Sequence, residues 1–246
     1  TLNAPPVSDA PVTERLKAND DRRLFTVFEA LKAGVGVDDI FELTKIDRWF
    51  LMKLRKMADF EQSLTKGGLS DETYFEAKRL GYTDAAIRRL TGTATLPEKK
   101  FSYKMVDTCG AEFAAETPYF YSTCDSFCES RTFPRSGKPV IMVLGSGPIR
   151  IGQGIEFDYS SVHCVWTLRD MGYDVVIVNN NPETVSTDYD TADRLYFEPL
   201  TPEDVMNIIE VEKPVGVVVA FGGQTAIKLT QILDKNGVRI LGTSAE

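Results

Sequence analysis

The chain has 246 residues, of which 43% are hydrophobic and 26% are charged, and its formal net charge is −8. This composition predicts a folded globular chain with room for two domains and excludes an intrinsically disordered one. The negative charge argues against nucleic acid as a partner, because its phosphates would be repelled. No apolar run reaches the roughly 18 to 20 residues of a membrane span and no signal peptide opens the sequence, so we expect no membrane partner.

The cysteines and the histidine predict no metal site. Cys109, Cys124, Cys128 and Cys164 follow none of the spacings of zinc sites, and the chain has a single histidine, His163. We expect free thiols, as in a cytosolic protein, and therefore a cytoplasmic location. His163 lies on a predicted apolar helix, where a packing role is expected rather than that of a catalytic base.

Residues 13–92 have the pattern of a small all-helical domain, and a proline-containing arm precedes them. Apolar residues recur at three- and four-residue steps, and glycines interrupt the pattern. Helices are predicted over residues 13–33, 37–46, 47–64, 70–80 and 85–90. The second and third resemble a DNA-binding helix pair, but acidic residues and Trp49 are interleaved with the basic ones. A packed bundle, or a surface for another subunit, is therefore favoured over DNA binding.

The segment from Leu96 to Lys138 is predicted to be an irregular connector that is rich in aromatic residues. It contains two extended runs, Phe101–Asp107 and Pro118–Thr123, among threonine, cysteine, proline and glycine residues. We expect it to wrap one or both domains through its aromatic side chains. The predicted domains are residues 1–131, which include this connector, and residues 132–246.

After Pro139 the sequence alternates between strands and helices, which predicts a parallel sheet. The expected strands are Val140–Leu144, Asp174–Asn179, Val215–Ala220 and Val238–Leu241, with helices over residues 160–171, 202–210 and 225–233. The fold class is therefore α + α/β, a small all-helical domain followed by an open, mostly parallel α/β sheet. Ligands of such sheets bind at the carboxyl ends of the strands.

Three loops at that edge are candidate binding elements. The first strand runs into a glycine-rich loop, where free backbone amides could face an anion. The second strand ends in an NPET loop, and the third ends in the sequence FGGQT. The candidate residues of the three loops are Gly145, Gly147, Gly152, Gly154, Asn181, Glu183, Asp188, Gly222, Gly223 and Gln224.

The charges around the glycine-rich loop do not match a dinucleotide site. Arg150 stands where the third glycine of that fingerprint belongs, and the second strand ends in asparagines rather than in an acid for a ribose hydroxyl. Glu156, Glu183 and Asp188 are expected at the same edge as Arg150. Carboxylates are costly to bury unless they are paired or face water. A polar channel, or a site for a charged intermediate, would explain them.

Long motifs of the chain resemble the large subunits of carbamoyl-phosphate synthase. These motifs are GSGPIRIGQGIEFDYSSVH, VNNNPETVSTDYDTADRLYFEP and FGGQT, with ELTKIDRWFLMKL and YKMVDTCGAEF upstream. The likeness covers nearly the whole chain. It implies an internal piece of such a subunit, in which a helical oligomerisation domain precedes the Rossmann-like pre-ATP-grasp domain of the second synthetase half.

The resemblance implies a ligase that makes carbamoyl phosphate from bicarbonate, ammonia derived from glutamine, and two ATP, for arginine and pyrimidine biosynthesis. It implies ATP, Mg²⁺ or Mn²⁺, and K⁺ for the whole enzyme, whose ATP-grasp domain is expected to follow this piece. Glu156 and Glu183 match glutamates that line an intermediate tunnel, Gly154 matches the small residue beside them, and Arg150 is expected to contact the anion. Implied partners are the rest of the large subunit, a small glutaminase subunit, and further copies through the helical domain.

The alternative is a stand-alone regulatory module whose glycine-rich loop binds a small anion or a nucleotide. Saturable binding of ATP or NAD by this chain would favour that alternative. The resemblance implies instead a chain that binds no cofactor, holds no catalytic residue and is inactive by itself.

Overall fold

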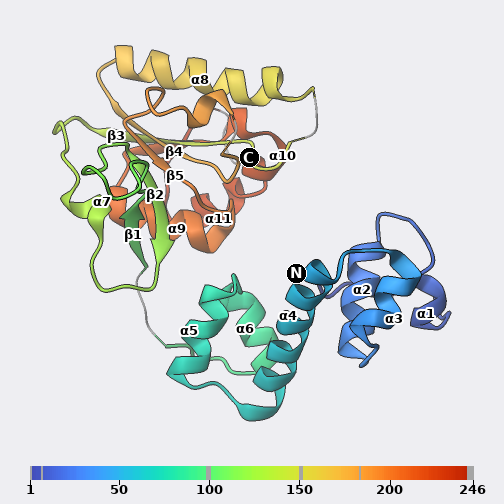
Figure 1. Ribbon diagram of the computed structural model, residues 1–246. Coiled ribbons are helices and arrows are strands. Elements are labelled where there is room, and N and C mark those ends of the chain that lie inside the picture. The colour runs from blue at the N-terminus through green and yellow to red at the C-terminus, as the bar shows by residue number, and fades with distance from the viewer. Residues whose placement is uncertain (1, 7, 98–100, 150–151, 183, 243–246) are drawn as a thin grey trace. The chain divides into compact units, whose positions relative to one another are not determined.

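Figure 1 shows the computed structural model, which describes residues 2–6, 8–97, 101–149, 152–182 and 184–242. The chain divides into two compact units, residues 1–98 and residues 99–246. This division differs from the predicted boundary at residues 131/132, because two strands of the connector pair within the sheet of the second unit. Among the described residues, no helix is long and apolar enough to cross a membrane.

The described part of the first unit is all-helical, as the sequence predicts. The expected helix over residues 13–33 is instead two helices, because an Asn-Asp-Asp turn interrupts it and the Asp20 carboxylate accepts a hydrogen bond from the Arg22 amide at 3.0 Å. Three later helices begin at side-chain caps, since Asp47, Ser70 and Thr83 each accept from a backbone amide of the first turn. The helices are α1 (Val12–Arg15), α2 (Arg23–Lys32), α3 (Val37–Thr44), α4 (Arg48–Gly67), α5 (Asp71–Arg79) and α6 (Asp84–Thr91).

The long helix α4 contributes to two hydrophobic clusters of the first unit. Leu51 and Ala58 pack with residues of α2 and α3, including Phe28 and Ile40. Farther along the same helix, Phe60 packs in a second cluster with side chains of α5 and α6. The amphipathic α4 therefore holds the other helices together.

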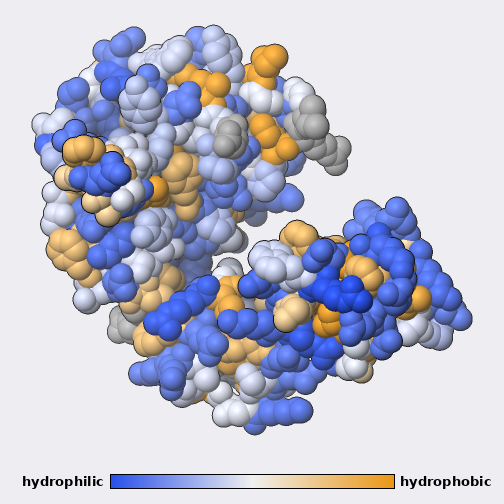
Figure 2. Space-filling model, viewed as in Figure 1, coloured by the Kyte–Doolittle hydropathy of each residue, from blue (hydrophilic) through white to orange (hydrophobic). Residues whose placement is uncertain are grey.

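The start of α4 carries large apolar side chains that face solvent. Trp49, Phe50 and Met52 are 59%, 58% and 62% exposed, and the first two rings contact edge-to-face with their centroids 5.0 Å apart. Figure 2 shows hydrophobic residues as separate patches on a mostly hydrophilic surface. The aromatic residues of α4 therefore differ in exposure, since Phe60 is buried whereas Trp49 and Phe50 are exposed.

The second unit is built on a seven-stranded sheet of the described residues, with strand order β1-β2-β5-β4-β3-β6-β7. Every pair of neighbours is parallel except β1 and β2. The strands are β1 (Ser102–Met105), β2 (Tyr119–Thr123), β3 (Val140–Leu144), β4 (Asp174–Val178), β5 (Arg194–Tyr196), β6 (Gly216–Val218) and β7 (Ile240–Leu241). The predicted fold class, an all-helical part followed by an open, mostly parallel sheet, is confirmed.

Helices cover both faces of this sheet (Figure 1). Helix α8 (Gly154–Asp170) packs Val165 against β3 and β4 on one face. On the other face, α9 (Pro202–Glu212), α10 (Gly223–Ile227) and α11 (Thr230–Lys235) pack side chains such as Ile208 and Leu233. Both faces of β4 are buried, which explains its continuous apolar sequence. A short helix, α7 (Glu129–Thr132), follows β2.

Four local predictions for the second unit are wrong. The segment after the NPET sequence contains strand β5, which was not predicted. The first residue of this strand, Arg194, is charged although it is buried. Helix α8 starts at Gly154 rather than near residue 160. The third strand ends at Val218, since a 3-10 turn, η2 (Ala220–Gly222), follows it. The single helix expected to reach Leu233 is two helices, α10 and α11.

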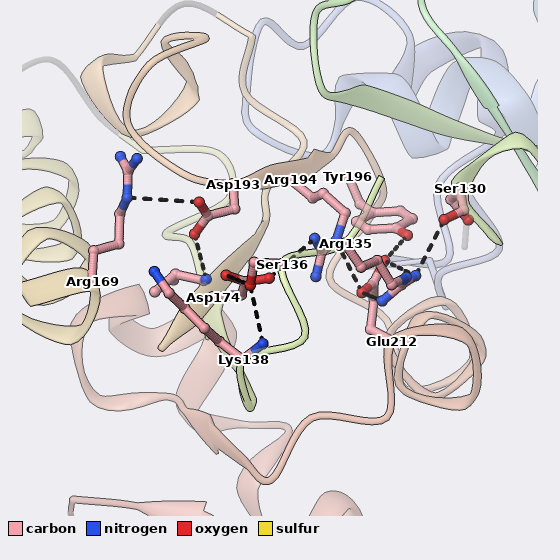
Figure 3. A network of polar contacts seen from close by, with 11 residues as sticks. Ser130, Arg135, Ser136, Lys138, Arg169, Asp174, Asp193, Arg194, Tyr196 and Glu212 are labelled. Atoms are coloured by element: carbon pink, nitrogen blue, oxygen red, sulfur yellow. Dashed lines mark hydrogen bonds and ion pairs between the residues drawn. The ribbon is translucent and has the colours of Figure 1, made fainter. Parts of the chain in front are cut away.

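A buried ionic network lies at the amino ends of β4 and β5 (Figure 3). Arg194 is 1% exposed, and its Nε donates to Glu212 Oε2 at 3.1 Å. Glu212 also accepts from Arg135 Nη1 at 2.7 Å and from the Tyr196 hydroxyl. Asp174 lies 3.8 Å from Arg194 Nη1. These contacts join α9 and the chain before β3 to the centre of the sheet.

Replacing Glu212 with glutamine should destabilise the second unit strongly. Two guanidinium groups would lose their shared carboxylate in a buried place, and breaking one partner of such a pair costs about 3–5 kcal/mol. Denaturant unfolding of the 246-residue chain measures this loss, with the exposed Asp234→Asn as the control. A change within about 0.5 kcal/mol, the size usual for surface substitutions, would contradict the network's contribution to stability.

Glu198 should make the stability of the second unit depend on pH. Burial raises its pKa to about 7, and Asp204 adds to the shift, although the Ser122 amide donates to its carboxylate. The native chain keeps a proton that the unfolded chain loses near pH 4.5. This contribution to stability is therefore complete below about pH 4.5 and is lost as the pH rises through about 7. We expect the difference in unfolding free energy between Glu198→Gln and the unsubstituted chain to shift in favour of the variant when the pH is raised from 5 to 8. Denaturant unfolding at the two pH values measures this difference, and an equal difference at both would refute the prediction.

Candidate functional site

The glycine-rich turn after β3 is packed closely against two neighbouring strand ends. A Cβ on Gly145 would lie 2.6 Å from Asn179 Cγ, and one on Gly222 would lie 2.6 Å from the Gly145 carbonyl oxygen. Gly147 and Gly223 have φ values of 65° and 59°, which favour glycine. The exits of β3, β4 and β6 can meet at this edge because these positions carry no side chain.

Asn179 holds the turn in place from the end of β4. Its side chain is fully buried, and Oδ1 accepts from the amides of Gly147 at 3.1 Å and Asn181 at 3.4 Å. Its Nδ2 and the Ser146 hydroxyl are buried without a hydrogen-bond partner among the described residues. In the sequence, Asn179 is only a departure from dinucleotide sites, and neither side chain was predicted as a site residue.

A cavity of about 930 Å³ opens between the start of α8 and the loop after β4. Its apolar walls include Ile149, Ile155 and Val185, and its backbone walls include Gly152 and Gly154. The remaining described lining residues are Asp158, Tyr159, Asn181, Pro182, Thr184 and Asp188. The lining residues therefore come from both of the loops that the sequence analysis placed at this edge.

The carboxylates at this site have different environments. Glu156 lies in the first turn of α8 and is exposed, but it is not among the described lining residues of the cavity. Asp188 lines the cavity and is also exposed. Asp158 is only 5% exposed, and its two oxygens accept from the Ser186 amide at 3.4 and 3.2 Å. Among the described lining residues there are two aspartates and no lysine or arginine. This lining disfavours tight binding of an anion.

Not every predicted site residue belongs to the described cavity lining. Arg150 and Glu183 lie outside the described residues. Four of the other predicted residues line the cavity, namely Gly152, Gly154, Asn181 and Asp188. The described lining does not include Glu156, Gly145, Gly147, Gly222, Gly223 or Gln224. Gln224 is exposed in the first turn of α10. The roles predicted for all of these residues stay predictions.

The turn that follows the NPET sequence is held by residues that were not predicted. Asp158 binds it from α8, and the Tyr119 hydroxyl donates to the Thr187 carbonyl at 2.7 Å from β2. Burial raises the pKa of Tyr119, with Asp188 adding to the effect, so this hydroxyl stays a donor. An acid on a helix that packs against a sheet was a signal for Asp158. The sequence carried no such signal for Tyr119, because its hydrogen-bond partner is 68 positions away.

The described residues offer no cluster of three or more side chains for a metal ion. All four cysteines are free. His163 is exposed rather than packed in the core, and its ring contacts Tyr159 and Trp166 at centroid distances of 4.4 and 5.3 Å along α8. The geometry thus defines an open parallel α/β domain with an acidic, partly apolar cavity at the ligand edge, linked to a helical domain.

Comparison with known proteins identifies both parts. Residues 137–246 match the carbamoyl phosphate synthase preATP-grasp domain, and residues 2–104 match the carbamoyl-phosphate synthetase large chain oligomerisation domain. The chain belongs to the carbamoyl phosphate synthase large-chain family.

Similar relatives are carbamoyl phosphate synthase large chains of several bacteria. Identity is 51% over 96% of this chain with the Lachnoclostridium phytofermentans protein, 51% over 98% with that of Agathobacter rectalis, and 52% over 92% with that of Deinococcus radiodurans. The chain spans about 23% of the length of each of these relatives. It therefore corresponds to one fragment of a large subunit.

Proposed function

We propose that this chain supplies a wall of the passage that delivers an anionic intermediate to the carbamate-phosphorylating half of a carbamoyl phosphate synthase. The parent would be a cytoplasmic ligase that joins bicarbonate, ammonia derived from glutamine, and two ATP, and its product would serve arginine and pyrimidine biosynthesis. The acid-lined cavity beside the glycine-rich turn carries the proposal. Glu156, Glu183, Gly154 and Arg150 are the residues proposed to face the intermediate.

The cavity's charge suits a passage better than a binding pocket. A conduit must let its cargo enter without holding it, so weak interaction with an anion is an advantage. The exposed carboxylate of Asp188 in the lining stays hydrated, which avoids the cost of burying a charge. Exclusion of bulk solvent would protect a labile carbamate from protonation.

Phosphoryl transfer would belong to other parts of the parent enzyme. It requires metal ions and cationic clamps around the phosphates, and the described lining residues include neither lysine nor arginine. ATP, Mg²⁺ or Mn²⁺, and K⁺ are therefore proposed for the whole enzyme and not for this chain. A stand-alone nucleotide-binding module fits this lining poorly, and micromolar binding of ATP or NAD in a calorimetric titration of the chain would favour that module instead.

Glu156→Gln and Glu183→Gln test the passage in the full-length large chain with ammonium as the nitrogen source. We expect bicarbonate-dependent ATP hydrolysis to survive while carbamoyl phosphate per ATP falls several-fold, because loss of the wall carboxylates lets the intermediate escape or stall. Asp170→Asn, at the opposite end of the same helix, is the matched control. Normal coupling in both glutamate variants would rule out the role.

We also propose that the helical unit joins copies of the parent protein, alongside partners in the rest of the large subunit and a glutaminase subunit. The support is the match to an oligomerisation domain and the exposed group of Trp49, Phe50 and Met52. Exposed aromatic groups of this kind are enriched at protein interfaces.

Light scattering tests self-association of the 246-residue chain. The average mass should rise with concentration, and the double variant Trp49→Ala, Phe50→Ala should stay monomeric because its apolar contact surface is lost. Phe113→Ala removes an even more exposed ring from the second unit and should associate normally. A monomer at every concentration, or equal association of all three chains, would contradict this role.

A further inference from the structure

The turn formed by Thr184 and η1 (Val185–Thr187) is a wall of the acidic cavity, and Thr184, Val185 and Asp188 line it. The turn has an internal brace, since Thr184 and Thr187 form a capping box. Its central residues, Ser186 and Thr187, are 1% and 2% exposed. The turn is therefore braced internally. Its position depends on the contacts that it makes with other elements.

Two contacts hold this turn from elements that are distant in the sequence. On one side, both carboxylate oxygens of Asp158 accept from the Ser186 amide. On the other side, the Tyr119 hydroxyl donates to the Thr187 carbonyl at 2.7 Å. The Tyr119 ring is itself fixed by an edge-to-face contact with Phe197 at 5.1 Å. The turn is thus clamped between α8 and β2.

The contacts of the clamp are hard to replace by water. Asp158 is buried, so the Ser186 amide would be left without its partner if the carboxylate were removed. Leaving such a buried group unsatisfied is more costly than the loss of an ordinary hydrogen bond. The rest of the segment is tied down less directly, by the Thr191 hydroxyl to the Val185 carbonyl at 2.9 Å and by Arg169 to the carbonyls of residues 190 and 191.

We propose that Asp158 and Tyr119 are positioning residues that set the location of the 184–187 turn and thereby the width of the passage beside it. The inference rests on the proposed passage. It gives the connector strand β2 a part in the site, because Tyr119 connects this strand to the cavity wall. Neither residue is required to touch the intermediate.

The test uses the full-length large chain with ammonium as the nitrogen source and measures ATP hydrolysed per carbamoyl phosphate formed. Asp158→Ala and Tyr119→Phe should raise this ratio several-fold, with little change in the KM for ATP. Asp158→Asn keeps an acceptor oxygen and should restore most of the coupling. Tyr121→Phe, in the same strand but with a hydroxyl that makes no hydrogen bond within the described residues, should behave as the unsubstituted enzyme.

Hydrogen exchange of the segment 184–191 supplies a second measurement. Loss of one hydrogen bond of ordinary strength should speed exchange of this segment about fivefold in Tyr119→Phe, and more in Asp158→Ala. Faster exchange with unchanged coupling would show that the clamp is only structural and would overturn the proposal. If coupling is unchanged in Glu183→Gln and in the clamp variants, the proposed passage does not exist. Uncoupling in Glu183→Gln alone, with normal clamp variants, would leave the passage and refute the positioning role.

Discussion

The second unit depends on the close approach of the chain at the exits of three adjacent parallel strands. Gly222, after β6, leaves no room for a Cβ between the carbonyl oxygens of Leu144 and Gly145. On the other side, the Asn179 side chain lies over Gly145 and hydrogen-bonds the amide of Gly147. Because the backbone is this close, packing and the hydrogen bond from Gly147 hold the start of the glycine-rich turn in place. The loop that begins at Asn181 is consequently brought against the start of α8, and the cavity lies between them.

The two ends of the sheet have different physical roles. At the amino ends, the buried Arg194 forms ion pairs with Glu212 and Asp174, and Arg135 pairs with Glu212 from a more exposed position, which holds α9 and the central strands together. At the carboxyl ends, the carboxylates of Glu156 and Asp188 stay in contact with solvent. A charge can be buried when it is paired, whereas a carboxylate that stays in water avoids the cost of burial.

Much of the architecture followed from local patterns. Val140–Leu144 and Val175–Val178 are short apolar runs in strands that are buried on both faces. The caps Ser70, Thr83 and Thr201 mark true helix starts, because capping is decided by neighbouring residues. Long motifs likewise identified the family, which the domain matches confirm. Local pattern failed where a distant partner changed the meaning of a residue. Arg194 suggested a polar loop, yet ion pairs with Glu212 and Asp174 bury it within a strand.

What the sequence determined by itself was the order of elements, the parallel sheet and the loops at its carboxyl edge, since periodicity, caps and glycines act over a few residues. Only the tertiary structure decided that the connector contributes β1 and β2 to the sheet, and that Tyr119 and Asp158 hold the turn at residues 184–187. These contacts join positions 68 and 28 residues apart. No local pattern encodes such pairs, because the hydrogen bonds form only after the strands and helices have packed.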